Sequence, residues 1–194
     1  MRLSGKASPS AQRGGMMIEV MVSLLIFSFG LLGYSSLQAR AAVAQYEALQ
    51  RTQALVLVDD MVSRLSANRA EASNYLVNGL IGAGNVQNCA GLVAAALDLC
   101  EWANLIRGST ETRNGLRVGA MTVARGCISR VADTSDRYMI AVAWQGVSAT
   151  GAPASNCGSG DAAYPSENLR RVVTATVCIG RLRDPAIAAA VARC

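Results

Sequence analysis

The chain has 194 residues, a formal net charge of +5 and no histidine. The lack of histidine excludes acid–base catalysis and metal binding through imidazole. Lys6 is the only lysine and lies near the N-terminus, so the remainder of the chain has no amine for Schiff-base catalysis. The length has room for one membrane helix and one globular domain of about 120 residues.

Residues 1–14 are expected to form a leader peptide without regular structure. They contain the cations Arg2, Lys6 and Arg13 and no acid. A basic segment before an apolar helix places that end of the helix in the cytoplasm. Because the positive charge lies mainly in this leader, the overall charge gives little reason to expect a nucleic-acid partner.

Residues 16–37 form an apolar run that is long enough to cross a bilayer as one helix. Glu19 is the only charged residue in it. A carboxylate in hydrocarbon costs roughly 2.5–3.5 kcal/mol, so Glu19 requires a partner. A cut between Gly14 and Gly15 would supply one, because the freed α-amino group is a cation and Glu19 becomes the fifth residue.

This combination of Gly14, Gly15, an apolar helix and Glu19 resembles the class III signal of type IV prepilins. The resemblance implies cleavage by a prepilin peptidase after Gly14, N-methylation of Gly15 and a role for Glu19 in subunit assembly. Two other interpretations stay open. In the first, the segment is an ordinary single span and the Glu19 side chain reaches the membrane edge. In the second, the segment is a secretory signal that is cut near Ala41.

The helix is expected to run from Gly15 to about Asn68, roughly 80 Å in length. Residues 15–38 would be its transmembrane and filament-core half, and residues 39–68 its outer half. Apolar residues recur in the outer half at three- and four-residue steps, which predicts a stripe packed on the globular domain. The stripe consists of Tyr46, Leu49, Ala54, Leu57, Met61 and Leu65. Gly30 and Gly33 either allow close helix contact or simply lower helix propensity.

Residues 69–194 are expected to form a periplasmic globular domain. Gly79–Asn85 reads as a loop and is followed by a second helix with Trp102 on its flank. Its predicted core-facing residues are Leu92, Ala96, Leu99, Ala103 and Ile106.

Three strands are predicted after this helix, at residues 116–130, 138–145 and 171–182. The second strand alternates Tyr138, Ile140, Val142 and Trp144 on one face. A polar connection at 132–137 predicts a hairpin between the first two strands. A long loop with Cys157 precedes the third strand, and Asp184-Pro185 predicts a short helix over 186–193.

All six cysteines lie beyond the apolar run, which favours disulfides in an oxidising, exported domain. The candidates are Cys89, Cys100, Cys127, Cys157, Cys178 and Cys194. We expect a Cys89–Cys100 pair to fix the loop before the second helix. The pairs Cys127–Cys157 and Cys178–Cys194 are favoured for the others. Neither C-x₂-C spacing nor histidine is present, so no metal site is expected.

Other polar groups give no catalytic constellation, so we expect no catalytic residue, no cofactor and no enzyme activity. Asp133 and Asp136 fit a polar hairpin better than a calcium loop. Asp60 and Arg64 have the spacing of a helical ion pair. The pairs Arg170-Arg171 and Arg181-x-Arg183 are expected to guard an exposed strand edge rather than to bind an anion or DNA.

The stretches Ile18-Glu19-Val20, Gly30–Gly33, Cys100-Glu101-Trp102 and Ala143–Gly146 look most like the minor pilins called PilV, or type IV pilus modification proteins. The resemblance implies an α+β pilin-like fold: a long N-terminal helix packed on a small antiparallel β-sheet, with disulfide-tied loops.

The same resemblance implies a structural subunit that passes from the inner membrane into a pilus. Its partners would be other minor pilins and the major pilin, with which it helps to initiate assembly and to present a tip adhesin in cell adhesion. A pseudopilin of a type II secretion system has the same N-terminal pattern and is the main alternative. A membrane-anchored periplasmic enzyme and a DNA-receptor pilin are further alternatives.

Overall fold

The structure of the protein is a computed structural model that describes residues 15–108, 112–114, 116–117, 121–132, 134 and 136–180. The chain divides into two compact units, Met1–Gln45 and Tyr46–Cys194. The expected leader, residues 1–14, and the expected C-terminal helix, residues 186–193, lie outside the described residues.

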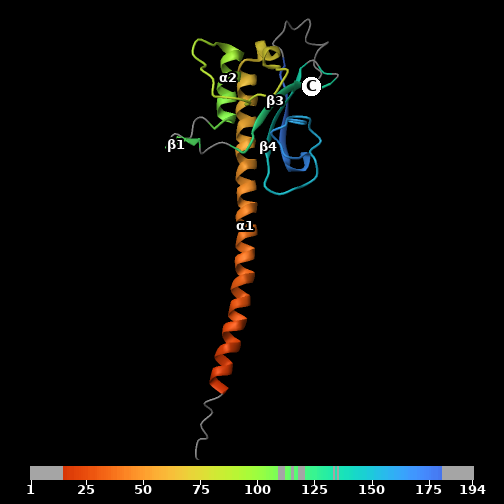
Figure 1. The fold of residues 1–194 in the computed structure, drawn as a ribbon. Coiled ribbons are helices and arrows are strands. Elements are labelled where there is room, and N and C mark those ends of the chain that lie inside the picture. The colour runs from red at the N-terminus through yellow and green to blue at the C-terminus, as the bar shows by residue number, and fades with distance from the viewer. Residues whose placement is uncertain are drawn as a thin grey trace, which may run out of the picture. The chain divides into compact units, whose positions relative to one another are not determined.

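The first element is one long helix, α1, which runs from Gly15 to Ala67 (Figure 1). It matches the predicted range because no proline interrupts the sequence between Pro9 and Pro153. At its end the amide of Asn68 donates to the carbonyl of Arg64 at 3.0 Å, and the short 3₁₀ helix η1, Arg69–Tyr75, follows.

The second helix, α2, spans Ala94–Ile106. It ends where Gly108 adopts a φ of 66°, a left-handed conformation that glycine tolerates at a helix C-terminus. The Gly108 amide donates to the Leu105 carbonyl at 2.8 Å, which satisfies one of the last carbonyls of the helix.

The sheet of the second unit has three antiparallel strands in the order β3-β4-β5. They span Arg125–Arg130, Arg137–Gln145 and Arg170–Cys178. The hairpin between β3 and β4 and the long connection to β5 were both predicted. A separate pair, β1 (Thr112–Arg113) and β2 (Leu116–Arg117), forms a two-residue hairpin ladder that was not predicted.

The inner face of the sheet forms the main core together with α2 and the outer part of α1. Its alternating residues on β4 are at most 4% exposed, as the period-two pattern predicts: Tyr138, Ile140, Val142 and Trp144. The α1 residues that meet them recur every three or four positions: Ala54, Val58, Met61 and Leu65.

The loop between β4 and β5 covers part of the outer face of the sheet. Ala141 and Ala143 of β4 pack against Cys157 and Tyr164 of this loop in a second, smaller core. Arg170 at the start of β5 holds this loop, since its guanidinium donates to the carbonyls of Ser155 at 2.7 Å and Cys157 at 2.9 Å. The strand therefore has side chains packed on both faces.

The predicted first strand, 116–130, is wrong in extent. Leu116–Arg117 belongs to the separate hairpin, and β3 begins only at Arg125. The chain turns between them at Val123, whose φ of 51° is incompatible with a strand. At its other end β5 stops at Cys178, whereas the sequence predicted a strand to residue 182.

The prediction that Trp102 lies on the flank of α2 is also wrong. Its side chain is completely buried, and Nε1 donates to the Leu57 carbonyl of α1 at 2.8 Å. Burying the indole requires a rotation of α2 relative to the predicted stripe. Leu92, which precedes α2, and Leu99 line an open cavity of about 350 Å³.

Arg170 was expected to guard an exposed edge, and this too is wrong. Its side chain is 2% exposed and pairs with Glu167 at 2.6 Å. A buried cation with carboxylate and carbonyl partners holds the loop, and does not repel neighbouring strands.

Gly126 of β3 provides a test of this packing. A Cβ there would lie 2.4 Å from the Trp102 ring and 2.6 Å from Ile106 Cδ1. We expect Gly126→Ala to lower the free energy of unfolding by about 1–3 kcal/mol, because neither neighbour can retreat from a filled core. Urea unfolding of the full chain in detergent, followed by tryptophan fluorescence, measures this.

The control for that measurement is Gly151→Ala in the β4–β5 loop, where a Cβ meets no atom within 4 Å. Its expected effect is within about 0.5 kcal/mol. Equal effects of the two variants would contradict the close approach of α2 to β3.

Candidate membrane and assembly helix

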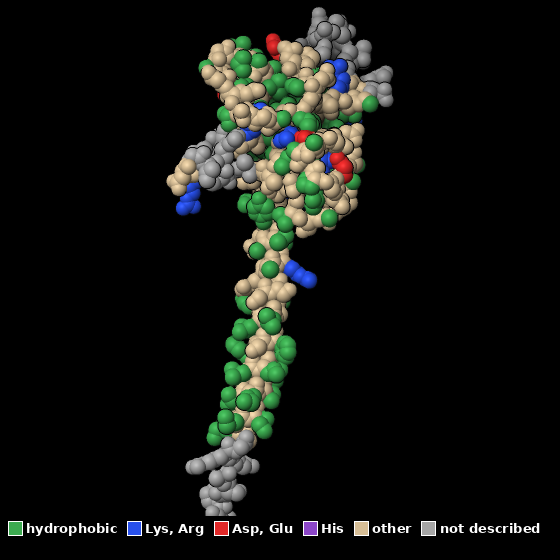
Figure 2. Space-filling model, in the orientation of Figure 1, with side chains coloured by type: hydrophobic (Ala, Val, Ile, Leu, Met, Phe, Trp, Pro, Cys, Tyr) green, Lys and Arg blue, Asp and Glu red, His purple; other side chains and the backbone are tan. Residues whose placement is uncertain are grey.

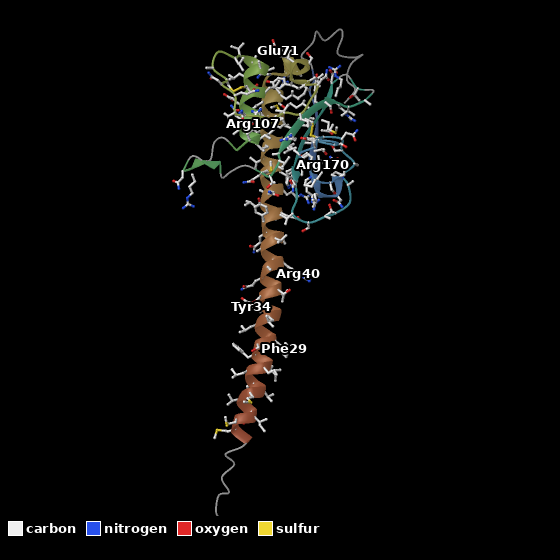
Figure 3. All side chains as sticks on the ribbon, in the orientation of Figure 1. Phe29, Tyr34, Arg40, Glu71, Arg107 and Arg170 are labelled. Atoms are coloured by element: carbon white, nitrogen blue, oxygen red, sulfur yellow. A yellow bond between two sulfur atoms is a disulfide. The ribbon has the colours of Figure 1, made fainter. Side chains whose placement is uncertain are left out.

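The apolar part of α1 is exposed in the part of the chain that the structure describes. Residues 15–45 are exposed throughout, and the large apolar side chains from Met16 to Leu37 are 49–70% exposed. Figure 2 shows hydrophobic side chains on both visible flanks of this helix, and Phe29 and Tyr34 project from it in Figure 3. A helix that is apolar on all sides and unburied fits an apolar surrounding better than water.

This is the one described helix that is long and apolar enough to cross a membrane. Core helices of soluble proteins and signal sequences can meet the same criterion. In the described structure, however, none of the apolar segment is buried, which distinguishes it from a core helix.

Gly15 and Glu19, the two described residues of the predicted signal, lie in the first part of α1. Gly15 is the first helical residue, and no atom stands within 4 Å of the position of a Cβ on it. Glu19 follows after four residues, a rise of about 6 Å, and is exposed. Gly14, on the other side of the expected cut, lies outside the described residues.

Two hydroxyl groups further along this helix are satisfied internally. Ser28 donates to the carbonyl of Leu24 at 2.7 Å, and Ser35 donates to that of Leu31 at 2.9 Å. Such bonds to the preceding turn remove the need for water. Glu19 is the only charged residue of the segment 16–37.

Within the second unit, polar contacts hold the outer part of α1 at both of its ends. At one end, Glu47 accepts hydrogen bonds from the amides of Val147 at 3.2 Å and Ser148 at 2.9 Å, and lies 3.7 Å from Arg171. Together with the Trp102–Leu57 bond, these contacts attach the helix to the sheet and to α2. Sequence analysis missed Glu47, because nothing in its local pattern indicates a partner a hundred residues away.

At the other end, Arg64 joins three carboxylates. It lies 2.9 Å from Asp60, 3.1 Å from Asp98 and 2.7 Å from Glu101. The predicted Asp60–Arg64 pair is thus confirmed, and the two α2 carboxylates extend it across the helix pair. Burial lowers the pKa of the Arg64 guanidinium, but its hydrogen bonds to the carboxylates outweigh this effect and raise it overall.

Tyr75 and Asn68 complete this cluster around Asp98. The Tyr75 hydroxyl donates to Asp98, and the Asn68 amide donates to both of them at 2.8 Å. Burial, together with the hydrogen bond to Asp98, raises the pKa of Tyr75 to about 12. The phenol therefore stays protonated at neutral pH and remains a donor.

The structure contains the first two favoured disulfides, Cys89–Cys100 and Cys127–Cys157. The first ties the 77–93 segment to α2, and the second ties the β4–β5 loop to β3. Cys178 is also in a disulfide, while Cys194, its expected partner, lies outside the described residues. No free cysteine occurs in the part of the chain that the structure describes.

Within those same residues, no group of three potential ligands is placed to hold a metal ion. Asp136 is buried, and its carbonyl accepts a hydrogen bond from Ile179 at 2.8 Å. Asp133, the other residue weighed for calcium, lies outside the described residues, as do Arg181 and Arg183.

No protein-family model, no curated protein and no solved structure matches this chain.

The Arg64 cluster generates a testable prediction. Arg64→Leu leaves the carboxylates of Asp60, Asp98 and Glu101 close together without a cation. We expect a loss of about 1–3 kcal/mol in unfolding free energy, less than for a fully buried pair because the Arg64 side chain is 22% exposed. Urea unfolding in detergent at neutral pH measures it.

Arg51→Leu is the matched control, since Arg51 is exposed on the same helix. It is expected to change the free energy by less than about 0.5 kcal/mol. If both substitutions had the same effect, the cluster would not be what joins α1 to α2.

Proposed function

We propose that the protein is a minor type IV pilin, a structural subunit that is stored in the inner membrane and then enters a pilus. The observation that carries the proposal is the uncovered apolar half of α1, with Glu19 as its only carboxylate, four residues after Gly15. A segment of this kind needs an apolar environment and a cation for Glu19.

Both environments of a pilin meet these needs. In the membrane, lipid surrounds the apolar side chains, and in the filament the equivalent helices of neighbouring subunits replace the lipid. Cleavage after Gly14 creates a cationic N-terminus at Gly15, which would neutralise Glu19 of the same subunit or of the adjoining one. The carboxylate thus specifies the register between subunits. An ordinary single span has no such use for a carboxylate and would avoid the cost of burying one in lipid.

The second unit supports the proposal through its disulfides and its polar contacts with α1. Disulfides at Cys89–Cys100 and Cys127–Cys157 suit a domain that stays folded outside the cytoplasm. The polar contacts of Glu47 and Arg64 hold that domain on the outer part of α1, so movement of the helix into a filament carries the domain with it.

In this role the protein acts with other minor pilins and the major pilin. It helps to initiate assembly and to present an adhesin at the tip, after processing by a prepilin peptidase. A pseudopilin of a type II secretion system is the alternative with the same helix, and the experiments below distinguish it.

The first prediction is that the mature chain begins at Gly15 with an N-methyl group. Only a cut after Gly14 makes Glu19 the fifth residue, although glycine on both sides of the bond offers two adjacent cleavage positions. Intact mass and N-terminal sequencing of the protein from membranes decide the matter. A start at Met16 or at Ala41 would refute the assignment.

The second prediction is that Glu19→Ala reduces the number of surface pili severalfold without blocking membrane insertion. Removing the charge makes insertion easier, but leaves the ammonium at Gly15 unpaired in a low dielectric, which can cost roughly 3–5 kcal/mol. Surface pili are counted by electron microscopy, with an immunoblot to show cleavage and membrane association.

Ser23→Ala, one turn further along α1, is the control and is expected to leave the pilus number unchanged. Normal piliation with Glu19→Ala would defeat the assembly role. Normal piliation combined with a loss of protein secretion would instead assign the chain to a type II secretion system.

A further inference from the structure

The outer edge of β5 is one of the two edges of the three-stranded sheet and has no partner among the described strands. β5 pairs with β4 along its whole length of nine residues, Arg170–Cys178. An edge strand of this length is commonly protected by charges, a proline or a bulge. Between Val172 and Val177 there is none of these, since the sequence there is Val-Val-Thr-Ala-Thr-Val.

The two arginines at the start of β5 do not protect the edge either. Arg170 is buried under the β4–β5 loop. Arg171 donates to the carbonyls of Asn168 at 3.0 Å and of Ser148. Both guanidinium groups are directed into the subunit's own loop, so the strand is uncharged where it is open.

The register shows which backbone groups face this edge. The amide of Ile179 donates to Asp136, and that of Gly146 donates to Leu169, both at 2.8 Å. Since hydrogen-bonded pairs alternate along an antiparallel ladder, Val173, Ala175 and Val177 exchange their bonds with β4. The N–H and C=O groups of the intervening residues, Val172, Thr174 and Thr176, therefore point away from β4.

The core is also incomplete along this edge. Val173, Ala175 and Val177 point to the inner face but are only partly buried. Their partners on β4, in contrast, are 0–1% exposed: Val142, Ile140 and Tyr138. A further strand would cover the half-exposed apolar side chains and satisfy the open backbone groups in one step.

We propose that a neighbouring subunit of the same filament adds an extended strand to the outer edge of β5. The identity of the partner rests on the proposed function. The kind of segment that binds, an extended strand, rests on the open backbone groups of β5. The side chains of the incoming strand that lie beside Val173, Ala175 and Val177 are uncharged, because a charge on this inner face would be desolvated without a counter-ion. The incoming strand places β-branched or small apolar side chains toward the inner face and serine or threonine beside Thr174 and Thr176.

Two other occupants fit less well. The chain's own residues 181–194 contain Pro185 and an alanine-rich run, a composition that disfavours a strand. A second copy paired antiparallel about a two-fold axis would point the two α1 segments that lie on the inner face in opposite directions. Two copies inserted in one membrane have these helices in the same direction.

Amide hydrogen exchange of the full-length protein in detergent tests the free edge. The amides of Thr174 and Thr176 are expected to exchange at least about tenfold faster than those of Val173 and Ala175, because only the latter are bonded to β4. In sheared filaments the difference should disappear. Slow exchange of Thr174 in the detergent monomer would show that the chain's own residues cover the edge, and would overturn the inference.

Concentration-dependent protection together with a dimer mass would indicate a second copy, and would overturn it as well. Fast exchange of Thr174 and Thr176 in the filaments would show that no strand is added.

The variant Thr174→Pro tests the consequence for assembly. Proline removes an N–H that points away from β4, so the β4–β5 ladder is preserved while the added strand loses a bond. Thr174→Val keeps the N–H and the branched side chain and is the matched control. We expect the amount of Thr174→Pro in sheared filaments to fall at least about tenfold at an unchanged membrane level, and Thr174→Val to remain at the wild-type level.

Thr176→Pro is the second variant, used if Thr174→Pro does not accumulate with the Cys89–Cys100 and Cys127–Cys157 disulfides formed. Proline variants that enter filaments like the wild type would overturn strand addition alone. Absence of the wild-type protein from filaments would instead overturn the proposed function, so the two failures are distinguishable.

Discussion

The exposed apolar half of α1 is the constraint on which the rest of the structure depends. Side chains such as Phe29 and Leu32 are more than three-fifths exposed, and burying apolar surface is worth roughly 25 cal/mol per Å². Such a surface is unfavourable in water at every turn of the helix. The segment is long and apolar enough to cross a membrane, and in the proposed function lipid or other helices cover it.

The second unit is built to hold the other half of the same helix firmly. Apolar residues of α1 enter the core at Ala54, Val58, Met61 and Leu65, while Glu47 and Arg64 attach the helix at either end. The inner face of the sheet packs against α1 and α2, and part of its outer face is covered by the loop that Arg170 and the Cys127–Cys157 disulfide hold. Among the described residues, the outer edge of β3 is bonded to Ile81 at Gly126, whereas the outer edge of β5 has no paired strand.

Sequence reasoning predicted those parts of the fold in which a local pattern corresponds to one environment. The alternation on β4 is of this kind, since each side chain meets the surroundings that its period implies. The range of α1 was also predicted, but Tyr46 and Leu49 of its predicted stripe are exposed, and Val58 is buried in the core. Sequence reasoning failed where contacts with residues far away in the chain determine the position of a side chain or the path of the backbone. Trp102 is drawn into the core by Leu57, Val123 turns the chain with a left-handed φ that no propensity suggests, and Arg170 is buried by a loop that precedes it. At the candidate site, Glu19 was identifiable because a lone charge in an apolar run is conspicuous, whereas the Glu47 attachment depends on contacts a hundred residues apart.

The central claim is that the apolar half of α1 exchanges lipid for the helices of a filament. Quantitative mass spectrometry of purified surface filaments from the producing cell tests it most directly. The account predicts that peptides from residues 46–180 are recovered in those filaments at a small and reproducible ratio to the major subunit. Recovery of the protein in the inner membrane alone, with none in filaments, would contradict it.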